Sequence, residues 1–327
     1  MPVGIIRIGA HVPPDVVDNA TVARWSGASP DWTDQRTGIR ERRYAADGVA
    51  TSDLATAAAL DALGADREEW PHIDWIALAT STGDRPQPAT AALTQDKLGL
   101  HGIPAFDVNA VCSGFLFALD IGRALVDRPG GESGALVVAA DMYSRIMNRS
   151  DRKTVALFGD GAGAAVLGPV PEGYGIHAVK LVTDGDRSGL VGVAAGGTAK
   201  ALDPQAWEAG EHLFAMDGRA VRDYVLATLP KLVAEVLQES SLELGDIDRV
   251  IFHQANTRLL EQCVRDLGID PARVPMTAPR YGNTGAASIP ITLHDAHLRS
   301  PLRRGERVLL AGVGGGMTAG AAVMTWY

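Results

Sequence analysis

The segment GAGAAVL at residues 161–167 returns as TAGAAVM at residues 318–324, with five of the seven positions identical. Each copy closes a series in which short aliphatic runs alternate with Ala- and Leu-rich stretches of helical length. Such alternation is typical of an α/β fold. Pro and Gly cluster at residues 169–173, between the two series. We therefore predict an internal duplication, with one half at residues 1–170 and the other at 171–327.

The predicted elements of the first half follow from these runs. Strands are expected over 3–8, 75–79, 105–108 and 135–140, and helices over 51–63, 88–98 and 114–126. The strand runs lack a polar face, as expected for a sheet that helices cover on both sides.

The second half repeats the pattern. Helices are expected over 217–239, 257–267 and 286–298, and strands over 249–252, 308–313 and 321–327. Residues 183–204 are rich in Gly and Ala without clear periodicity, which indicates a surface loop.

Composition excludes several classes of protein. With 46% hydrophobic and 21% charged residues, the 327-residue chain is in the range of ordered globular proteins. A formal charge of −9 argues against a nucleic-acid-binding surface across the whole protein. No apolar run is long enough for a membrane span, and the N-terminal residues lack the pattern of a signal peptide, so we expect a cytoplasmic protein. Two cysteines are too few for a disulfide framework.

Cys112 lies in FDVNAVCSGFLFALDIG, residues 106–122, which indicates a buried strand, a turn of small residues and a helix. A thiol at a helix N-terminus meets unpaired N–H groups and the positive end of the helix dipole, which lower its pKa and favour a nucleophile. The alternative for Cys112 is a buried small hydrophobe. Cys263 lies inside a predicted helix, where core packing is the expected role.

Three further segments have turns where chemistry is possible. His253 follows a predicted strand, where an imidazole can donate or move a proton. Asn283 follows a glycine turn, and either catalysis or helix capping would suit it. The run GGG at residues 314–316 offers backbone N–H groups to an oxyanion, or is simply a tight turn.

Two other patterns are weak. Gly159, Gly161 and Ala164 match a dinucleotide-binding fingerprint, but the following residues predict a strand where that fingerprint needs a helix. His294 and His297 have helical spacing for a metal site, yet no third ligand cluster accompanies them, so we expect no metal.

Together, VNAVCSGF, FGDGAGAAVL, HQANTR, YGNTGAAS and GVGGGMTAG resemble the β-ketoacyl-acyl carrier protein synthase III family. The resemblance covers nearly the whole chain and includes DWTDQRTGIRERR at residues 31–43. It implies a thiolase fold of five layers, αβαβα, usually a homodimer. It also implies acyl-CoA as a substrate, malonyl-acyl carrier protein as a partner, and no metal or redox cofactor.

The resemblance also assigns roles to residues of this chain. Cys112 would be the nucleophile, and His253 with Asn283 would assist decarboxylation. The amides of Cys112 and Gly315 would form the oxyanion hole. The CoA-facing positions would be Trp32, Arg36, Arg152 and Asn256, since an aromatic ring can stack on adenine and guanidinium groups can hold phosphates.

The sequence departs from the family pattern at several positions. Gln87 stands where the family often has Phe at the end of the acyl pocket, across the dimer, and Val313 stands where Phe is common. On the carrier-protein face, Arg258 is retained, whereas a Lys pair is replaced by Arg265 and Asp266. Primer choice and carrier docking are therefore expected to differ from the family pattern.

Three functions fit the residues to different degrees. The first is a condensing enzyme that starts a fatty-acid or polyketide chain. The second keeps the fold and Cys112 but transfers an acyl group without decarboxylation; Asn283 argues against it, because transfer alone needs no enolate-stabilising amide. The third, a non-catalytic partner subunit, is disfavoured by the joint presence of Cys112, His253 and Asn283.

Overall fold

Two β-sheets run through the protein in the computed structural model, which describes residues 1–127 and 133–327. The first sheet, in spatial order, contains β1 (Val3–His11), β7 (Asp160–Pro169), β6 (Ala135–Met142), β4 (Trp75–Ala79) and β5 (Ala105–Val108). The second sheet contains β11 (Arg249–Phe252), β12 (Arg307–Gly314), β13 (Thr318–Thr325) and β8 (Gly175–Thr183). Every strand predicted from the sequence is present.

The two copies of the repeated segment occupy the same place in the two sheets. β7 lies between β1 and β6 and is antiparallel to both. β13 lies between β8 and β12 and is also antiparallel to both. Beyond them, β6 runs parallel to β4, and β12 runs parallel to β11.

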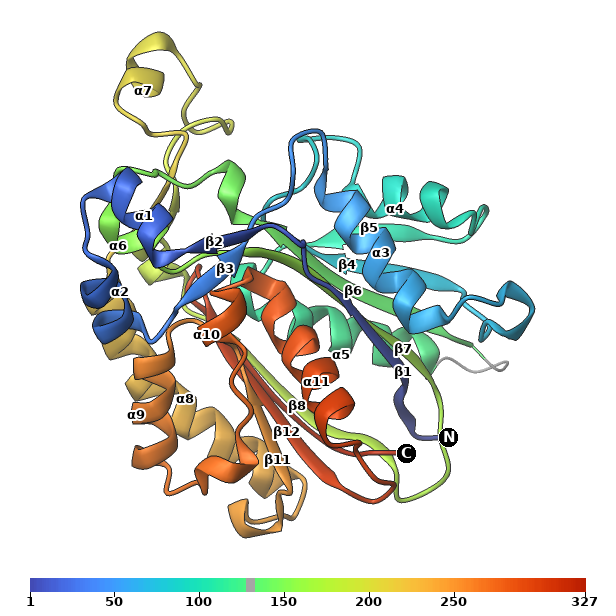
Figure 1. The fold of residues 1–327 in the computed structure, drawn as a ribbon. Coiled ribbons are helices and arrows are strands. Elements are labelled where there is room, and N and C mark those ends of the chain that lie inside the picture. Colours follow the sequence, from blue (N-terminus) through green and yellow to red (C-terminus); the bar gives the residue numbers. More distant parts are fainter. Residues whose placement is uncertain (128–132) are drawn as a thin grey trace.

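Helices lie in three layers around and between the sheets (Figure 1). The outer face of the first sheet is covered by α3 (Thr51–Leu63) and α4 (Thr90–Leu98). Between the sheets lie α5 (Gly114–Val126) and α11 (Ser288–Arg299). The outer face of the second sheet is covered by α8 (Gly218–Glu239) and α9 (Thr257–Asp266). The five-layered αβαβα arrangement is therefore confirmed.

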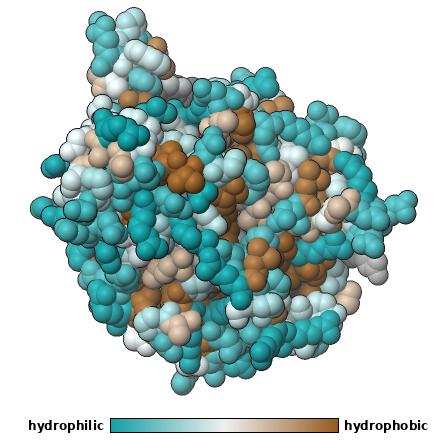
Figure 2. Space-filling model, viewed as in Figure 1, coloured by the Kyte–Doolittle hydropathy of each residue, from teal (hydrophilic) through white to brown (hydrophobic). Residues whose placement is uncertain are grey.

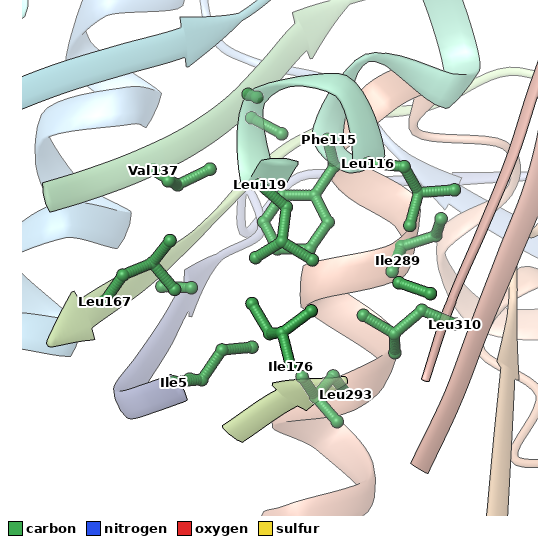
Figure 3. Packing of buried hydrophobic residues seen from close by; sticks show 14 of the residues in the cluster. Ile5, Phe115, Leu116, Leu119, Val137, Leu167, Ile176, Ile289, Leu293 and Leu310 are labelled. Atoms are coloured by element: carbon green, nitrogen blue, oxygen red, sulfur yellow. The ribbon is translucent and has the colours of Figure 1, made fainter. Parts of the chain in front are cut away.

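Buried aliphatic and aromatic side chains hold the central layer together (Figure 3). The cluster joins both sheets to both central helices, through Phe115, Leu116 and Leu119 of α5, Ile289 and Leu293 of α11, Ile5, Val137 and Leu167 of the first sheet, and Ile176 and Leu310 of the second. Full burial of one such side chain contributes roughly 1.5–3 kcal/mol. The start of α5, which follows Cys112 directly, is thus anchored in the core.

Glycines in the repeated segment let α11 approach β7. A Cβ at Gly163 would lie 2.8 Å from Pro290, and one at Gly161 would lie 2.8 Å from Ile291. At Gly163 the contact is with a rigid proline ring and the backbone of α11, so only glycine permits this approach, whereas at Gly161 the end of the Ile291 side chain could move aside. The approach fixes the start of α11, where the Asn283 turn ends.

Shorter elements complete the described chain. They are α1 (Asn19–Ser26), α2 (Pro30–Thr37), α6 (Arg152–Val155), α7 (Pro204–Glu208), α10 (Ala278–Tyr281), β2 (Val16–Asp18), β3 (Glu41–Arg43), β9 (Val191–Val193) and β10 (Phe214–Met216). β2 pairs with β3, and β9 pairs with β10.

Two sequence predictions need correction. The region 183–204, predicted as a loop, contains strand β9. No sign of this strand is visible in the sequence, because its partner β10 lies too far along the chain to produce a local pattern. The strand predicted over 321–327 spans Thr318–Thr325, because the tight glycine turn lets Thr318 pair with Gly314 already.

The surface facing the viewer in Figure 2 is mostly hydrophilic, with apolar side chains in scattered groups. The segment that carries α7 projects from the body of the protein (Figures 1 and 2). Within residues 1–127 and 133–327, we find no helix with both the length and the apolar character needed to cross a membrane.

Candidate active site

Cys112 lies on the tight turn that joins β5 to α5. A 3₁₀ turn over Val111–Ser113 leads directly into α5 at Gly114. Val111 has a φ of 48°, a left-handed conformation that β-branched residues rarely adopt. Such strain persists only where the surroundings enforce it, and it clusters at functional sites. Here the anchored helix holds the turn, and the Cys112 side chain lines a cavity.

The glycine turn between β12 and β13 packs against the Cys112 turn. A Cβ at Gly314 would lie 2.8 Å from the backbone nitrogen of Cys112, so this contact requires glycine. Thr318 links the two turns, because its Oγ1 lies 2.9 Å from the carbonyl oxygens of both Ala110 and Gly315. The same Oγ1 lies 2.7 Å from Ser113 Oγ. These contacts fix the two backbone turns relative to each other.

His253 follows β11 and is buried. Its backbone N–H donates to the Ala311 carbonyl oxygen at 2.8 Å, and its Nδ1 lies 2.6 Å from Ser288 Oγ. The N–H of Gln254 already donates to that Oγ at 3.3 Å, so the hydroxyl hydrogen of Ser288 can point to Nδ1. Nε2 then carries the ring hydrogen. Burial lowers the pKa of His253 to about 4, so the imidazole is a neutral donor at neutral pH.

Asn283 is held by its own turn. The N–H of Gly285 donates to Asn283 Oδ1 at 2.9 Å, which leaves the amide NH₂ group at the other end of the side chain. The backbone of Asn283 pairs with Leu157 and Gly159, at 2.8 and 3.0 Å. Gly285 has a φ of 59°, and a Cβ there would lie 2.2 Å from Asp141 Oδ2. Glycine is therefore required for this turn.

One cavity brings the candidate catalytic residues together. Cys112, His253, Asn283 and Gly315 all line it. The rest of the wall is mostly apolar and includes Phe158, Val191, Phe214, Phe252 and Val313. Such a mostly apolar pocket with a few convergent polar groups is typical of a small-molecule site. Cys112 is buried, as its alternative role in core packing would require, and it also lines this cavity.

The predicted low pKa of Cys112 is wrong for this structure. Burial raises the pKa of the thiol to about 12, and the nearby carboxylate of Asp141 adds to the increase. The cost of burying a thiolate thus acts against the effect that the sequence predicted from the helix terminus. Cys263 is buried in α9 as predicted, and burial raises its pKa to about 11.

The predicted CoA-facing residues line a second cavity that adjoins the first. Trp32, Arg36, Arg152 and Asn256 all lie there, and Phe158 and Asn283 line both cavities. The guanidinium of Arg152 lies 5.2 Å from the centroid of the Trp32 ring. Asn256 also caps α9, because its Oδ1 accepts from the N–H groups of Arg258 and Leu259 at 2.8 and 3.2 Å.

Other predicted residues lie outside both cavities. Arg258 and Arg265 are exposed on α9, two helical turns apart. Arg258 forms an ion pair with Glu261, at 3.2 Å. Gln87 is exposed on the segment between β4 and α4 and does not line the cavity of its own chain.

The residues of the two weak sequence patterns lie at strand β7 and on helix α11. Gly159, Gly161 and Ala164 belong to or adjoin strand β7, as predicted, rather than a helix start. His294 pairs with Asp61, its Nε2 lying 3.3 Å from Oδ2, and His297 packs beside Trp326. Within the described part of the chain, no group of three His, Cys, Asp or Glu side chains is arranged to hold a metal ion.

Comparison with known proteins agrees with this geometry. Residues 106–185 match the family described as 3-oxoacyl-[acyl-carrier-protein (ACP)] synthase III, and residues 237–326 match its C-terminal family. The acetoacetyl CoA synthase NphT7 of Streptomyces sp. strain CL190 is 50% identical over 325 residues, which cover 98% of either chain. The β-ketoacyl-[acyl-carrier-protein] synthase III of Clostridioides difficile strain 630 is 38% identical over 99% of this chain and 98% of its own.

Solved structures give the same result. The 3-oxoacyl-(acyl carrier protein) synthase III of Pseudomonas aeruginosa PAO1 superposes with a TM-score of 0.90 at 34% identity, over 100% of this chain and 98% of its own. The priming β-ketosynthase of the R1128 polyketide pathway has a TM-score of 0.89 at 28% identity, over 99% and 96% of the two chains.

The chain belongs to the β-ketoacyl-acyl carrier protein synthase III family and has the thiolase fold. It is a ketosynthase III-type condensing enzyme, an acyltransferase of the kind that uses acyl-CoA. The comparisons give no support to plain acyl transfer without condensation.

Several residues that build the site were not found from the sequence. Ser288, Gly285 and Thr318 act through contacts with partners up to 208 positions away in the chain. A Ser at a helix start reads as an ordinary cap, and a Thr at the start of a strand gives no special signal, so only the three-dimensional arrangement shows these roles. Asp141 directly follows the strand predicted over 135–140, where a single carboxylate gives no periodic signal, and the structure extends that strand to Met142.

Proposed function

We propose that the enzyme takes an acyl group from acyl-CoA onto Cys112 and then condenses it with malonyl-acyl carrier protein. The observation that carries the proposal is the single cavity lined by Cys112, His253, Asn283 and Gly315. It contains a nucleophile, two neutral donors and a glycine turn that can approach an oxyanion closely.

In the first half-reaction, the sulfur of Cys112 attacks the thioester carbonyl of acyl-CoA. The bond from that carbonyl to the CoA sulfur breaks, and the thiol hydrogen of Cys112 leaves with CoA. The N–H groups of Cys112 and Gly315 would donate to the carbonyl oxygen as it gains charge.

In the second half-reaction, the malonyl group loses CO₂, and the bonding electrons form an enolate. Nε2–H of His253 and the NH₂ group of Asn283 would donate to its oxygen. The enolate carbon then attacks the acyl carbonyl on Cys112, a 3-oxoacyl thioester leaves, and the sulfur regains a proton. Held by Ser288 and Gly285 respectively, both donors need no rearrangement before reaction.

The adjoining cavity suits the CoA part of the primer. Trp32 offers an aromatic face, while Arg36 and Arg152 offer charge to phosphates. Because this cavity shares Phe158 and Asn283 with the Cys112 cavity, a thioester carried by CoA could reach the sulfur.

A specific observation favours a second candidate, in which the malonyl group arrives on CoA. The relative that is 50% identical is named as an acetoacetyl CoA synthase. On the predicted carrier face, Glu261 pairs with Arg258, and Asp266 follows Arg265, so positive charge for an acidic carrier protein is reduced. In this candidate the chemistry at Cys112 is unchanged, and the product is a 3-oxoacyl-CoA.

Malonyl-CoA and malonyl-acyl carrier protein, the two candidate extender substrates, are supplied separately to the acetylated enzyme. The 3-oxoacyl product is measured by mass spectrometry, and kcat/KM is compared between the two substrates. A higher value for the carrier protein supports the first candidate, and Arg258→Ala should lower it. A higher value for malonyl-CoA, unaffected by Arg258→Ala, supports the second. Condensation with neither extender would contradict both.

Three features of assembly and organisation belong to the same proposal. The halves are residues 1–170 and 171–327, which the equivalent positions of β7 and β13 support. The enzyme is a homodimer, which would let Gln87 reach the partner's acyl pocket. Its place is the cytoplasm, where acyl-CoA and carrier protein are available.

A further inference from the structure

Asp141 is a buried carboxylate that reaches the Asn283 turn, residues 283–286, and the proposed reaction gives it no role. It lies near the end of β6, with 0% of the residue exposed. One of its oxygens, Oδ2, accepts from the backbone N–H of Ala286 at 2.8 Å. The other, Oδ1, accepts from the N–H of Ser81 at 2.9 Å and from Thr82 Oγ1 at 3.0 Å. Asp141 therefore joins the segment after β4 to the turn that leads into α11.

Two consecutive N–H groups connect Asn283 to this carboxylate. The N–H of Gly285 donates to Asn283 Oδ1 at 2.9 Å, and the N–H of the next residue, Ala286, donates to Asp141. The turn and the carboxylate are in close contact, since a Cβ at Gly285 would lie 2.2 Å from Asp141 Oδ2. The carboxylate thus sets the position of Gly285, whose N–H fixes the Asn283 side chain.

The Asp141 side chain has little freedom to move. Ser81 Oγ and Thr80 Oγ1 also donate to Oδ1, at 3.1 and 3.3 Å. Thr82 Oγ1, which donates to the same oxygen, accepts from the N–H of Met142 at 2.7 Å. Donors thus reach both ends of the carboxyl group. Both oxygens must serve as acceptors, which a carboxylate allows and an amide does not.

We infer that Asp141 is a positioning residue for the second half-reaction, because its carboxylate holds the turn that aims the Asn283 amide at the enolate oxygen. This role depends on the proposed function, in which Asn283 donates to the enolate. The first half-reaction does not use the Asn283 amide. A loosened turn should therefore slow condensation and spare acyl transfer to Cys112, whereas loss of a merely structural contact would slow both steps alike.

Asp141→Asn removes one acceptor and nearly keeps the size of the side chain. The amide oxygen can serve the donors around Oδ1, so the NH₂ group faces the N–H of Ala286, which loses its acceptor. Because misplacing a reacting group by about 1 Å costs about 100-fold in rate, condensation should fall by about 10- to 100-fold. Acylation of Cys112 should not slow, because the charge of Asp141 raises the pKa of that thiol and opposes the thiolate. Single-turnover rates of the two steps give their ratio.

The matched control is Asp160→Asn. Asp160 is also a buried carboxylate, and it accepts from the N–H groups of Ala45 at 2.8 Å and of Ser144 at 2.9 Å. This variant should keep the wild-type ratio of condensation to acylation, and urea unfolding compares the stability of the two variants. An equal fall of both rates in Asp141→Asn, or the same change of ratio in Asp160→Asn, would overturn the inference.

Thr82→Val is a milder variant that serves if the Asp141→Asn protein does not fold. It removes a hydroxyl that donates to Asp141 Oδ1 and so loosens the carboxylate from its other end. The ratio of condensation to acylation should fall by about 3- to 10-fold, as expected for the loss of one hydrogen bond. An unchanged ratio in this variant would also count against the inference.

A double-mutant cycle shows whether Asp141 acts through Asn283. In an Asn283→Ala background, Asp141→Asn should lower condensation by less than about twofold, because the group that it positions is absent. An undiminished fall in that background would mean that Asp141 acts by another route.

A last readout needs no substrate. Hydrogen exchange of the peptide that contains Ala286 should be about tenfold faster in Asp141→Asn than in the wild type or Asp160→Asn, since the N–H has lost its acceptor. Unchanged exchange would refute the hold of Asp141 on the turn. Normal condensation by Asn283→Ala would instead remove the proposed role of Asn283, and the exchange rates would still show whether Asp141 holds the turn.

Discussion

Replacement of Gly314 by alanine tests how closely the glycine turn must approach the nucleophile. The added Cβ would lie 2.8 Å from the backbone nitrogens of Cys112 and Ser113 and 2.9 Å from the carbonyl oxygen of Ala110. These are backbone atoms, so neither side can rotate away, and the two turns must separate. Gly314 has no left-handed backbone conformation, so the expected effect is purely one of contact.

The magnitude follows from this overlap. Forcing an extra carbon into a packed site costs about 1–3 kcal/mol of unfolding free energy. A displacement approaching 1 Å at a reacting group costs about 100-fold in rate, so the smaller shift expected here should slow acylation of Cys112 by about 10- to 100-fold. The assay is the burst of CoA released from acetyl-CoA in single-turnover conditions, together with unfolding in urea.

Gly192→Ala is the matched control. Gly192 lies in β9, its backbone is not left-handed, and a Cβ there would meet no atom within 4 Å. This variant should acylate and unfold like the wild type. If Gly314→Ala also acylates at the wild-type rate, the close approach of the two turns is not what shapes the oxyanion site.

Three further outcomes are expected. Ser288→Ala removes the partner of His253 Nδ1 and should lower condensation up to about tenfold while changing acyl loading less, as single-turnover rates of the two steps would show. Burial lowers the pKa of His253 from 6.5 in the unfolded chain to about 4 in the folded protein. Between pH 6.5 and pH 4 the unfolded chain therefore binds more protons than the folded protein does. The free energy of unfolding should accordingly fall by about 2 kcal/mol when the pH is lowered from 6.5 to 5. Urea unfolding should show a larger loss in the wild type than in His253→Gln, which keeps the lowered pKa values of His11, His177 and His297; equal slopes in both would contradict the prediction. In the proposed homodimer, where Gln87 would face the partner's acyl pocket, Gln87→Phe should change the ratio of kcat/KM between straight-chain and polar acyl-CoAs, since a buried amide facing hydrocarbon costs about 1–3 kcal/mol; an unchanged ratio would remove Gln87 from specificity.

The layered fold could be predicted because its signals are local or repeated. The strand at 75–79, the helix at 51–63 and the helix at 114–126 have the predicted bounds, since continuous apolar runs and Ala-rich stretches define them without distant partners. β9 could not be predicted, because three residues paired with a distant short strand leave no periodic pattern.

The candidate site was predictable in its residue types but not in its electrostatics. Cys112, His253 and Asn283 each stand in a turn that a motif marks, and the structure places them around one cavity. The pKa of Cys112 was predicted with the wrong direction, because Asp141 and the depth of burial depend on the packing of distant segments. Ser288, which orients His253, was missed for the same reason.

The most direct test separates the two half-reactions. Wild type, Cys112→Ala, His253→Ala and Asn283→Ala are each incubated with acetyl-CoA, and peptide mass mapping locates the acetyl group. Each is then mixed with the preferred malonyl thioester, and the 3-oxoacyl product is measured. We expect acetyl on the Cys112 peptide in all but Cys112→Ala, and a loss of condensation by about 10²- to 10³-fold in His253→Ala and Asn283→Ala. Acetyl on Cys263, or normal condensation by Asn283→Ala, would contradict the proposed mechanism.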